Sequence, residues 1–173
     1  IDWLEAQNIP LTLLPGHEIF YTDHTPRLLR QGEVNRLGDS SYVLVEFSPE
    51  TPFERIEEAI QKLTVSGYRV LVAHFERYQC LRNISRVKDL RNRFGCRMQM
   101  NAHTVIVKPS FFTGRWIKHV YDEHLVDAIA SDAHGTSSRR THMTAAYEAL
   151  SQRYGEDTAH LLLIDNPEKY LHE

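Results

Sequence analysis

Short apolar runs alternate along this chain with segments of helical periodicity, and this alternation restricts the fold more than any other feature. Residues 42–47, 68–73 and 126–130 are almost continuously apolar and have the length of buried strands. Residues 51–66 instead place apolar side chains on one helical face, and Gly67 follows as a helix end. Strands that are apolar on both faces are typical of parallel sheets covered by helices, so the pattern predicts parallel βαβ units.

The same reasoning predicts the remaining elements. Strands are expected at residues 11–14 and 97–101, and helices at residues 84–94, 111–124 and 138–154. At 173 residues, the chain has the length of one domain with a substantial core. We therefore expect an α/β fold in which residues 1–173 form a single domain.

The predicted strands end in side chains that bind metals in proteins. Five residues take such positions: Glu18, Glu46, His74, Asp132 and His134. In parallel α/β folds the carboxyl ends of the strands meet at one edge, where the chemistry of these folds is found. Carboxylates together with imidazoles suit Mn²⁺, Fe²⁺, Zn²⁺ or Mg²⁺, and the absence of cysteine from the set argues against a structural zinc site. Two or more such metals would activate water and hold the attacking and leaving oxygens of a phosphoester.

Two arginines follow the expected ligands closely. Arg77 and Arg139 are natural phosphate-binding residues, because a guanidinium group matches phosphate oxygens in a bidentate manner. The sequence leaves ordinary structural roles open for all of these residues. Either arginine would otherwise be a surface ion-pair partner, a lone glutamate would be a solvated loop residue or a helix cap, and His74 would be a satisfied core histidine. Three further histidines stand near the expected site without an assigned role: His17, His24 and His103.

One competing motif is the segment 80–86, which matches the Cys-x5-Arg pattern of cysteine-dependent phosphatases. That chemistry needs a thiolate at a helix N-terminus, inside a tight loop of backbone N–H groups. The loop contains no glycine, and no predicted strand runs directly into Cys80, so we disfavour a nucleophilic cysteine. Cys80 and Cys96 are also too few for a disulfide framework, which predicts a reducing, cytoplasmic location.

Charge and hydropathy exclude two further classes of protein. The net charge is −3, and no run or stripe of Lys and Arg is present, so nucleic-acid binding is not indicated. No apolar stretch approaches the roughly 20 residues that a membrane helix needs, so membrane insertion is not expected either.

Several of these segments together resemble a known family. They are residues 16–18, 44–47, 73–77, 99–101 and 130–134, followed by Arg139, Met143 and the pair Asn166-Pro167. In this order they resemble the protein-tyrosine phosphatases of the polymerase-and-histidinol-phosphatase (PHP) superfamily, over about residues 10–170. Enzymes of that family serve bacterial capsule and exopolysaccharide loci and act on a partner tyrosine autokinase.

The resemblance implies a fold, a metal content and a role for each site residue. The fold would be a distorted βα barrel of the TIM-like PHP type, with a site for up to three metals that is most often filled by Mn²⁺. The implied metal ligands are Glu18, Glu46, His74, Asp132 and His134, and Arg77 and Arg139 would bind the phosphate. Attack on phosphorus would be direct, by a metal-bridging hydroxide and without a covalent phosphoenzyme. The implied partner is the phosphotyrosine tail of the autokinase.

The chain also departs from the family pattern. Family members open with a strand carrying His-x-His, then an Asp and another His, and this sequence contains no His-x-His. We therefore expect a barrel that is incomplete at its N-terminal side, fewer than three bound metals, little activity and possible self-association through the open side. Two alternatives remain: a PHP phosphoesterase for a small-molecule phosphate, and a non-catalytic regulatory binding protein.

Overall fold

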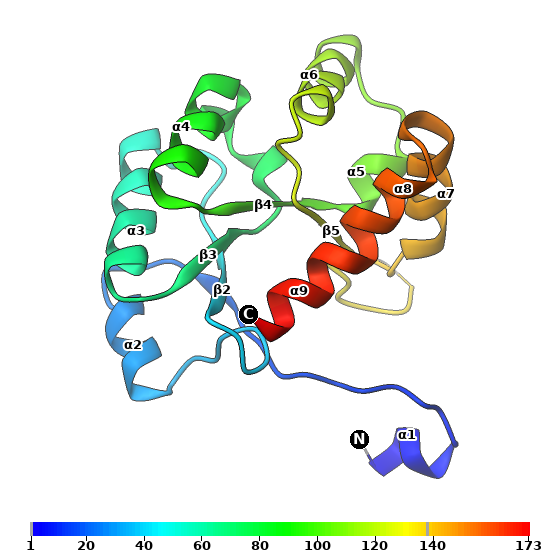
Figure 1. Ribbon diagram of the computed structural model, residues 1–173, viewed down its shortest axis with the longest axis horizontal. Coiled ribbons are helices and arrows are strands. Elements are labelled where there is room, and N and C mark those ends of the chain that lie inside the picture. The colour runs from blue at the N-terminus through cyan, green and yellow to red at the C-terminus, as the bar shows by residue number, and fades with distance from the viewer. Residues whose placement is uncertain (1, 138) are drawn as a thin grey trace.

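The computed structural model describes residues 2–137 and 139–173, and the fold is built on one parallel sheet (Figure 1). Its strands are β1 (Glu18–Phe20), β2 (Tyr42–Glu46), β3 (Arg69–Val72), β4 (Arg97–Asn101) and β5 (Ala128–Ala130). They are hydrogen-bonded in the order β1-β2-β3-β4-β5, and every pairing is parallel. The parallel α/β fold predicted from the apolar runs is therefore confirmed.

The register places the carboxyl ends of neighbouring strands at one edge of the sheet. Phe20 of β1 lies opposite Glu46 of β2, and Asn101 of β4 lies opposite Ala130 of β5. Among the described residues, β1 and β5 do not pair with each other, so the sheet stays open and forms part of a barrel wall rather than a closed barrel. The loops that follow the strands thus share one side of the molecule.

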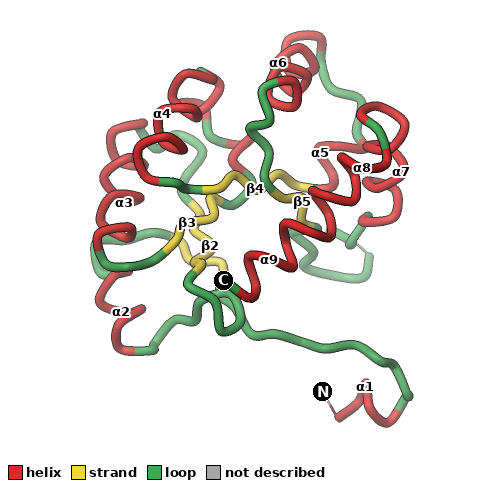
Figure 2. Tube along the Cα trace, viewed as in Figure 1, coloured by secondary structure: helices red, strands yellow, loops and turns green. Residues whose placement is uncertain are grey.

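Helices surround the sheet (Figure 2). Their bounds are α1 (Asp2–Ala6), α2 (Thr25–Gln31), α3 (Phe53–Val65), α4 (Ile84–Phe94), α5 (Ala102–Ile106), α6 (Phe111–Asp122), α7 (Met143–Tyr154), α8 (Glu156–His160) and α9 (Asn166–His172). Two short 3₁₀ turns, Phe75–Arg77 and Gln79–Arg82, follow β3, and a π-helical turn, Leu161–Asp165, joins α8 to α9. None of the described helices has both the length and the apolar character needed to span a bilayer.

Side chains alternate between the two faces of the sheet, as they must in extended strands. On one face, Val43 and Val45 of β2 join the main core together with apolar residues of α3, α4, α6 and α7. On the other face, Tyr42 and Leu71 contact Tyr170 of α9, and the rings of Tyr42 and Tyr170 lie 4.8 Å apart. Figure 1 shows α3 and α4 on one side of the sheet and α9 on the other. Burial on both faces explains why the strands lack a polar alternation.

The expected strand at residues 11–14 is wrong. This segment has no regular structure and leads away from the sheet toward α1, as the blue end of Figure 1 shows. The first strand begins later, at Glu18, and Leu11 and Leu13 are exposed. The physical reason is that no described strand lies beside β1 on that side, so residues 11–14 find no hydrogen-bonding partner.

One predicted helix also begins in a different place. The expected start at Ser138 lies outside the described residues, as does Ile1, and α7 begins only at Met143. His142, directly before it, has the left-handed backbone angle φ 50°, which an α-helix cannot contain. The helix 84–94 and the strand 97–101 are instead confirmed at both ends.

Candidate metal and phosphate site

Three of the predicted ligands meet where β1, β2 and β3 lie side by side. Nε2 of His74 lies 3.0 Å from Oε1 of Glu18 and 3.2 Å from Oε2 of Glu46. The ligand atoms of the three residues all lie within 4.8 Å of one another. Glu46 ends β2 and His74 lies just after β3, so the parallel register brings these two residues to the same edge of the sheet. Glu18 is instead the first residue of β1, opposite Leu44, and its side chain reaches the same point.

Hydrogen-bonding groups of Tyr78 and Gln99 fix the position of His74. Its Nδ1 lies 3.3 Å from the hydroxyl of Tyr78, and this hydroxyl also accepts a hydrogen bond from the backbone N–H of Phe47 at 3.1 Å. The backbone N–H of His74 donates to Oε1 of Gln99 at 2.7 Å. Histidines that bind metals commonly donate their second ring N–H to a fixed acceptor, and the Tyr78 hydroxyl stands where such an acceptor is needed.

The electrostatics around His74 favour its charged form. Burial opposes the imidazolium and Arg77 repels it, but the hydrogen bond to Glu18 and the neighbouring carboxylates outweigh both, so the pKa of His74 is raised. Burial also raises the pKa of the Tyr78 hydroxyl, which therefore keeps its proton at neutral pH. The site is thus built to hold a positive charge between Glu18 and Glu46, whether that charge is a proton or a cation.

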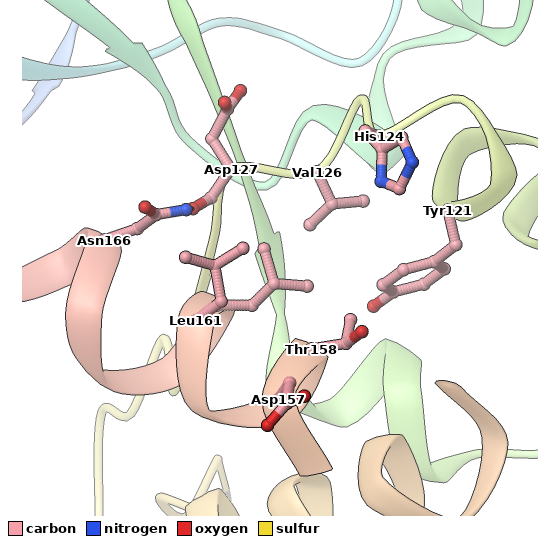
Figure 3. Close-up of a pocket in the computed structure, with 9 residues that line it drawn as sticks. Tyr121, His124, Val126, Asp127, Asp157, Thr158, Leu161 and Asn166 are labelled. Carbon is pink, nitrogen blue, oxygen red and sulfur yellow. The ribbon is translucent and has the colours of Figure 1, made fainter. Parts of the chain in front are cut away.

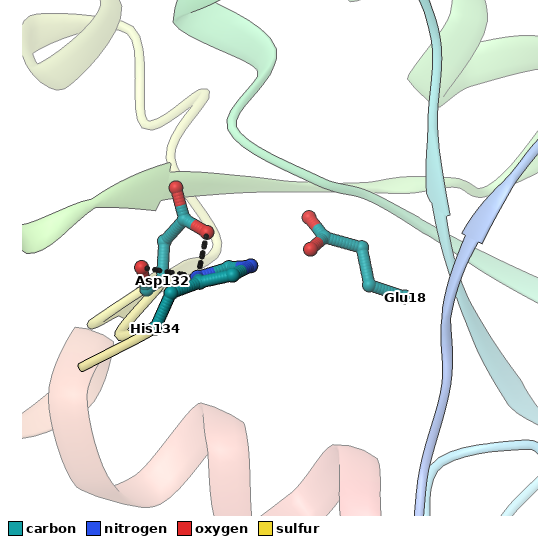
Figure 4. A group of neighbouring side chains, drawn as sticks. All are labelled: Glu18, Asp132 and His134. Atoms are coloured by element: carbon teal, nitrogen blue, oxygen red, sulfur yellow. Dashed lines mark hydrogen bonds and ion pairs between the residues drawn. The ribbon is translucent and has the colours of Figure 1, made fainter. Parts of the chain in front are cut away.

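The other two predicted ligands lie in the loop after β5. Asp132 and His134 form a second group with Glu18, again with ligand atoms within 4.8 Å of one another (Figure 4). Nδ1 of His134 lies 3.1 Å from the backbone oxygen of Asp132 and 3.5 Å from its carboxylate. Since Glu18 belongs to both groups, the five predicted residues form two overlapping sets of ligand atoms. Their role as metal ligands stays a prediction.

Both predicted phosphate-binding arginines contact Asp132. Nη2 of Arg77 lies 2.6 Å from Oδ2 of Asp132, and Nη2 of Arg139 lies 2.5 Å from Oδ1. Asn101 donates a further hydrogen bond to Oδ2 at 2.8 Å. Burial raises the pKa of Asp132, but Asn101 and the two arginines together lower it more, so the net pKa is below its ordinary value. The carboxylate therefore stays ionised and anchors two guanidinium groups that are 44% and 48% exposed.

Strained backbone marks the same region. Six non-glycine residues in the described part of the chain have positive φ, and four of them lie here: His74 at 31°, Asp132 at 49°, Arg139 at 50° and His142 at 50°. Side chains other than glycine adopt this conformation at a cost of about 1–2 kcal/mol. Such a concentration of left-handed residues is typical of sites where side-chain position outweighs local stability.

A polar network beneath the site was not predicted from the sequence. Gln99 donates to Oδ1 of Asn101 at 3.0 Å, and the carboxylate of Glu76 accepts from the backbone N–H of Asn101 at 3.1 Å and from Thr104 at 2.9 Å. Burial raises the pKa of Glu76. The network orients Asn101 toward Asp132. A signal was present, because Gln99 and Asn101 are polar residues in an otherwise buried strand and need hydrogen-bond partners there.

The competing cysteine site is not formed. Cys80 lies in the 3₁₀ turn Gln79–Arg82, and Arg86 donates to its backbone oxygen at 3.4 Å rather than framing a phosphate loop. Burial raises the pKa of the Cys80 thiol more than Arg86 lowers it. A nucleophilic cysteine requires a lowered pKa, so the structure agrees with the rejection of this motif.

A cavity of about 300 Å³ lies away from these residues, near the amino end of β5 (Figure 3). Tyr121, Leu161 and Asn166 contribute to its wall, and the Asp127 carboxylate points away from it. In the described chain, both groups of potential metal ligands lie at the opposite end of the sheet. The cavity therefore has no part in the candidate site.

The chain is similar to known proteins over nearly its whole length. Residues 2–172 match the protein family described as "Capsular polysaccharide synthesis, CpsB/CapC". The chain is 34% identical over 168 residues to the tyrosine-protein phosphatase CpsB of Streptococcus pneumoniae, which covers 93% of this chain and 68% of that protein. It is 27% identical over 168 residues to the tyrosine-protein phosphatase YwqE of Bacillus subtilis, covering 92% of this chain and 63% of that protein.

The fold matches a solved structure as well. The structure comes from work on YwqE of Bacillus subtilis and CpsB of Streptococcus pneumoniae, described as unique metal-dependent tyrosine phosphatases. The match has a TM-score of 0.85 at 26% sequence identity, and it covers 98% of this chain and 68% of that chain.

Proposed function

Since this chain belongs to the CpsB/CapC family of capsular polysaccharide synthesis proteins, as its motifs predicted, we propose that it is a metal-dependent protein-tyrosine phosphatase. The observation that carries the proposal is the position of Glu18, which is shared by two groups of ligand atoms beside a pair of exposed arginines. The proposed substrate is phosphotyrosine on a bacterial tyrosine autokinase, whose dephosphorylation would regulate capsule or exopolysaccharide synthesis.

The residues present fit a metal centre. Two carboxylates, those of Glu18 and Glu46, face Nε2 of His74. Asp132 and His134 complete the second group with Glu18. This mixture of oxygen and imidazole ligands suits Mn²⁺, which we propose as the native ion, with Fe²⁺, Zn²⁺ or Mg²⁺ as the other candidates. When bound, the metals would supply a Lewis acid and an activated water for attack on phosphorus.

Arg77 and Arg139 would bind the transferred phosphoryl group. Each guanidinium carries five N–H donors, and the ion pair with Asp132 is made through Nη2 in both arginines. Arginine pairs of this kind hold a tetrahedral phosphate and stabilise the charge that develops on its oxygens.

The openness of the site favours a protein substrate. Both arginines are nearly half exposed, which suits a phosphotyrosine on an extended chain better than a small phosphate in an enclosed pocket. The cytoplasmic location indicated by cysteine usage remains a prediction; neither Cys80 nor Cys96 is in a disulfide.

The test is hydrolysis of a phosphotyrosine peptide by the chain with Mn²⁺. We expect EDTA to abolish hydrolysis, Asp132→Ala to lose it and Cys80→Ser to retain it. Faster hydrolysis of a sugar phosphate than of the peptide would favour the small-molecule alternative. Mn²⁺ binding without hydrolysis of either substrate would favour a non-catalytic binding protein.

A further inference from the structure

The two arginines that we propose bind phosphate line a pocket of about 170 Å³, together with further basic side chains. Arg77, Arg139 and Arg140 supply three guanidinium groups to its lining, and His103 and His142 supply two imidazoles. Among the described residues of the lining, Asp132 supplies the only carboxylate, and it is already bonded to two of these arginines. The pocket therefore carries a net positive charge, although the whole chain has a net charge of −3.

Three of these basic residues have no task in the proposed reaction. His103 is on α5, directly after β4, while Arg140 and His142 precede α7, and the two imidazole rings lie 6.1 Å apart. Within the described part of the chain, their side chains form no ion pair and no hydrogen bond, so their donors remain available to a ligand.

The backbone conformation of His142 supports a role in binding for these basic residues. His142 keeps a left-handed conformation at φ 50°, where glycine or asparagine would be less strained, and it provides no side-chain cap for α7. Neither helix capping nor core packing thus explains a histidine at this position. Its half-buried ring instead lines the pocket beside His103.

We propose that His103, Arg140 and His142 form a second anion-binding subsite that receives another acidic group of the phosphotyrosine substrate. This inference rests on the proposed phosphatase function and adds a substrate preference to it. The metal ligands, Arg77 and Arg139 serve the phosphate that is removed, and the remaining basic groups bind a neighbouring anion on the same peptide. That anion is either the carboxylate of an Asp or Glu, or the phosphate of a second phosphotyrosine.

Three matched peptides test the subsite: one phosphotyrosine flanked by alanines, one flanked by glutamates, and one beside a second phosphotyrosine. With Mn²⁺ and low salt, we expect kcat/KM to be about fivefold higher for an acidic peptide than for the alanine peptide, because partly exposed ion pairs have modest effects. A gain with both acidic peptides indicates a general anion subsite. A gain with the doubly phosphorylated peptide alone assigns it to a second phosphate.

Variants connect the preference to the residues. Arg140→Ala and His103→Ala should bring the ratio between acidic and alanine peptides close to one, and Arg140→Glu should reverse it. Both residues are exposed, so the fold should tolerate these changes. Arg115→Ala is the matched control, because Arg115 is an exposed arginine of α6 outside the pocket lining, and it should leave the ratio unchanged.

The outcomes separate this subsite from the phosphatase itself. Equal kcat/KM for all three peptides, with p-nitrophenyl phosphate still hydrolysed, would overturn the subsite and leave the proposed function intact. No hydrolysis of any substrate would overturn the proposed function. In that case, calorimetric binding of sulfotyrosine peptides with flanking Glu or Ala decides the subsite, and equal affinities for the two would reject it.

Discussion

Two aspartates stand at opposite ends of β5 and pair with arginines in a similar way. Asp127 precedes the strand and Asp132 follows it, each side chain is only 7% exposed, and each contacts two arginines. Asp127 pairs with Arg91 at 2.8 Å and Arg97 at 3.5 Å. Their surroundings nevertheless give them different roles.

Asp127 is enclosed by structural partners. Its Oδ2 accepts the backbone N–H of Met98 at 2.8 Å, its backbone oxygen accepts a hydrogen bond from Asn166 at 2.8 Å, and Arg91 is only 18% exposed. These contacts join α4, β4 and α9 around the start of β5. Asp132 instead contacts two arginine side chains that are nearly half exposed, Arg77 in a 3₁₀ turn and Arg139 in the loop after β5. It also accepts a hydrogen bond from the buried Asn101 of β4. The arginine–aspartate cluster at Asp127 is enclosed by backbone groups and braces the fold. The cluster at Asp132 leaves its two arginines nearly half exposed, and its role in binding a ligand stays a prediction.

The pKa directions differ in the same way. Burial raises the pKa of Asp127 more than Arg91 and the Met98 N–H lower it, whereas Asn101, Arg77 and Arg139 outweigh burial at Asp132 and lower its pKa. A lowered pKa means that the folded state stabilises the carboxylate as an anion, the form that binds cations.

The largest expected effect is on stability, at Asp127. Asp127→Ala should lower the free energy of unfolding by about 3–5 kcal/mol, because it leaves Arg91 without its buried partner and the Met98 N–H without an acceptor. Urea denaturation measures this. Asp89→Ala is the control, since Asp89 pairs with Arg93 on the surface and should contribute less than about 1 kcal/mol. Similar losses of stability in both variants would show that the enclosed contacts of Asp127 stabilise the fold no more than an exposed ion pair does.

The next effect is on catalysis, at the arginines around Asp132. Arg77→Ala or Arg139→Ala should each cost about 2–4 kcal/mol in transition-state stabilisation, measured as kcat for phosphotyrosine hydrolysis with Mn²⁺. The melting temperature and the Mn²⁺ content should change little, since both side chains are exposed. A variant that lost its fold instead would show that its arginine resembles Arg91 and braces the structure.

A smaller effect is expected at Asn101, which orients Asp132 from β4. Asn101→Ala should weaken Mn²⁺ binding by about 10–100-fold, the usual consequence of removing a group that orients a metal ligand. Titration calorimetry with Mn²⁺ measures it, with urea denaturation recorded in parallel. Unchanged Mn²⁺ affinity in a folded variant would mean that the arginines alone position Asp132.

The smallest effect is the pH dependence of stability at Asp132. Its folded pKa lies below the ordinary value of 3.8, so its contribution is present above pH 3.8 and is lost as the pH falls through the folded pKa. At neutral pH we expect Asp132→Asn to change stability by no more than about 1 kcal/mol, because the partner arginines are open to water. Below pH 3.8 the difference from the parent chain should shrink. A difference that grows with acid would contradict the lowered pKa.

Much of the sheet, several helices and the side chains that converge could be read from the sequence. Apolar runs revealed β2, β3 and β5, and helical periodicity with a terminal glycine revealed α3. The polar residues that follow the apolar runs named the side chains that converge. These features are local: strand length, helical spacing and helix ends depend on neighbouring residues, and parallel pairing then brings all strand ends to one edge.

Only the tertiary structure decided which neighbours these residues would have. Residues 11–14 carry a strand-like pattern but find no partner beside β1, and a strand needs a neighbour to satisfy its backbone groups. The sequence named Asp132 as a candidate ligand but did not show that Asp127 joins α4, β4 and α9, because these contacts connect segments that are distant in the sequence. The left-handed backbone at His74 is likewise accompanied by a long-range contact, the hydrogen bond from its N–H to Gln99, and opposes local preference. The local sequence thus identified the residues, and packing across the sheet determined which residues they contact.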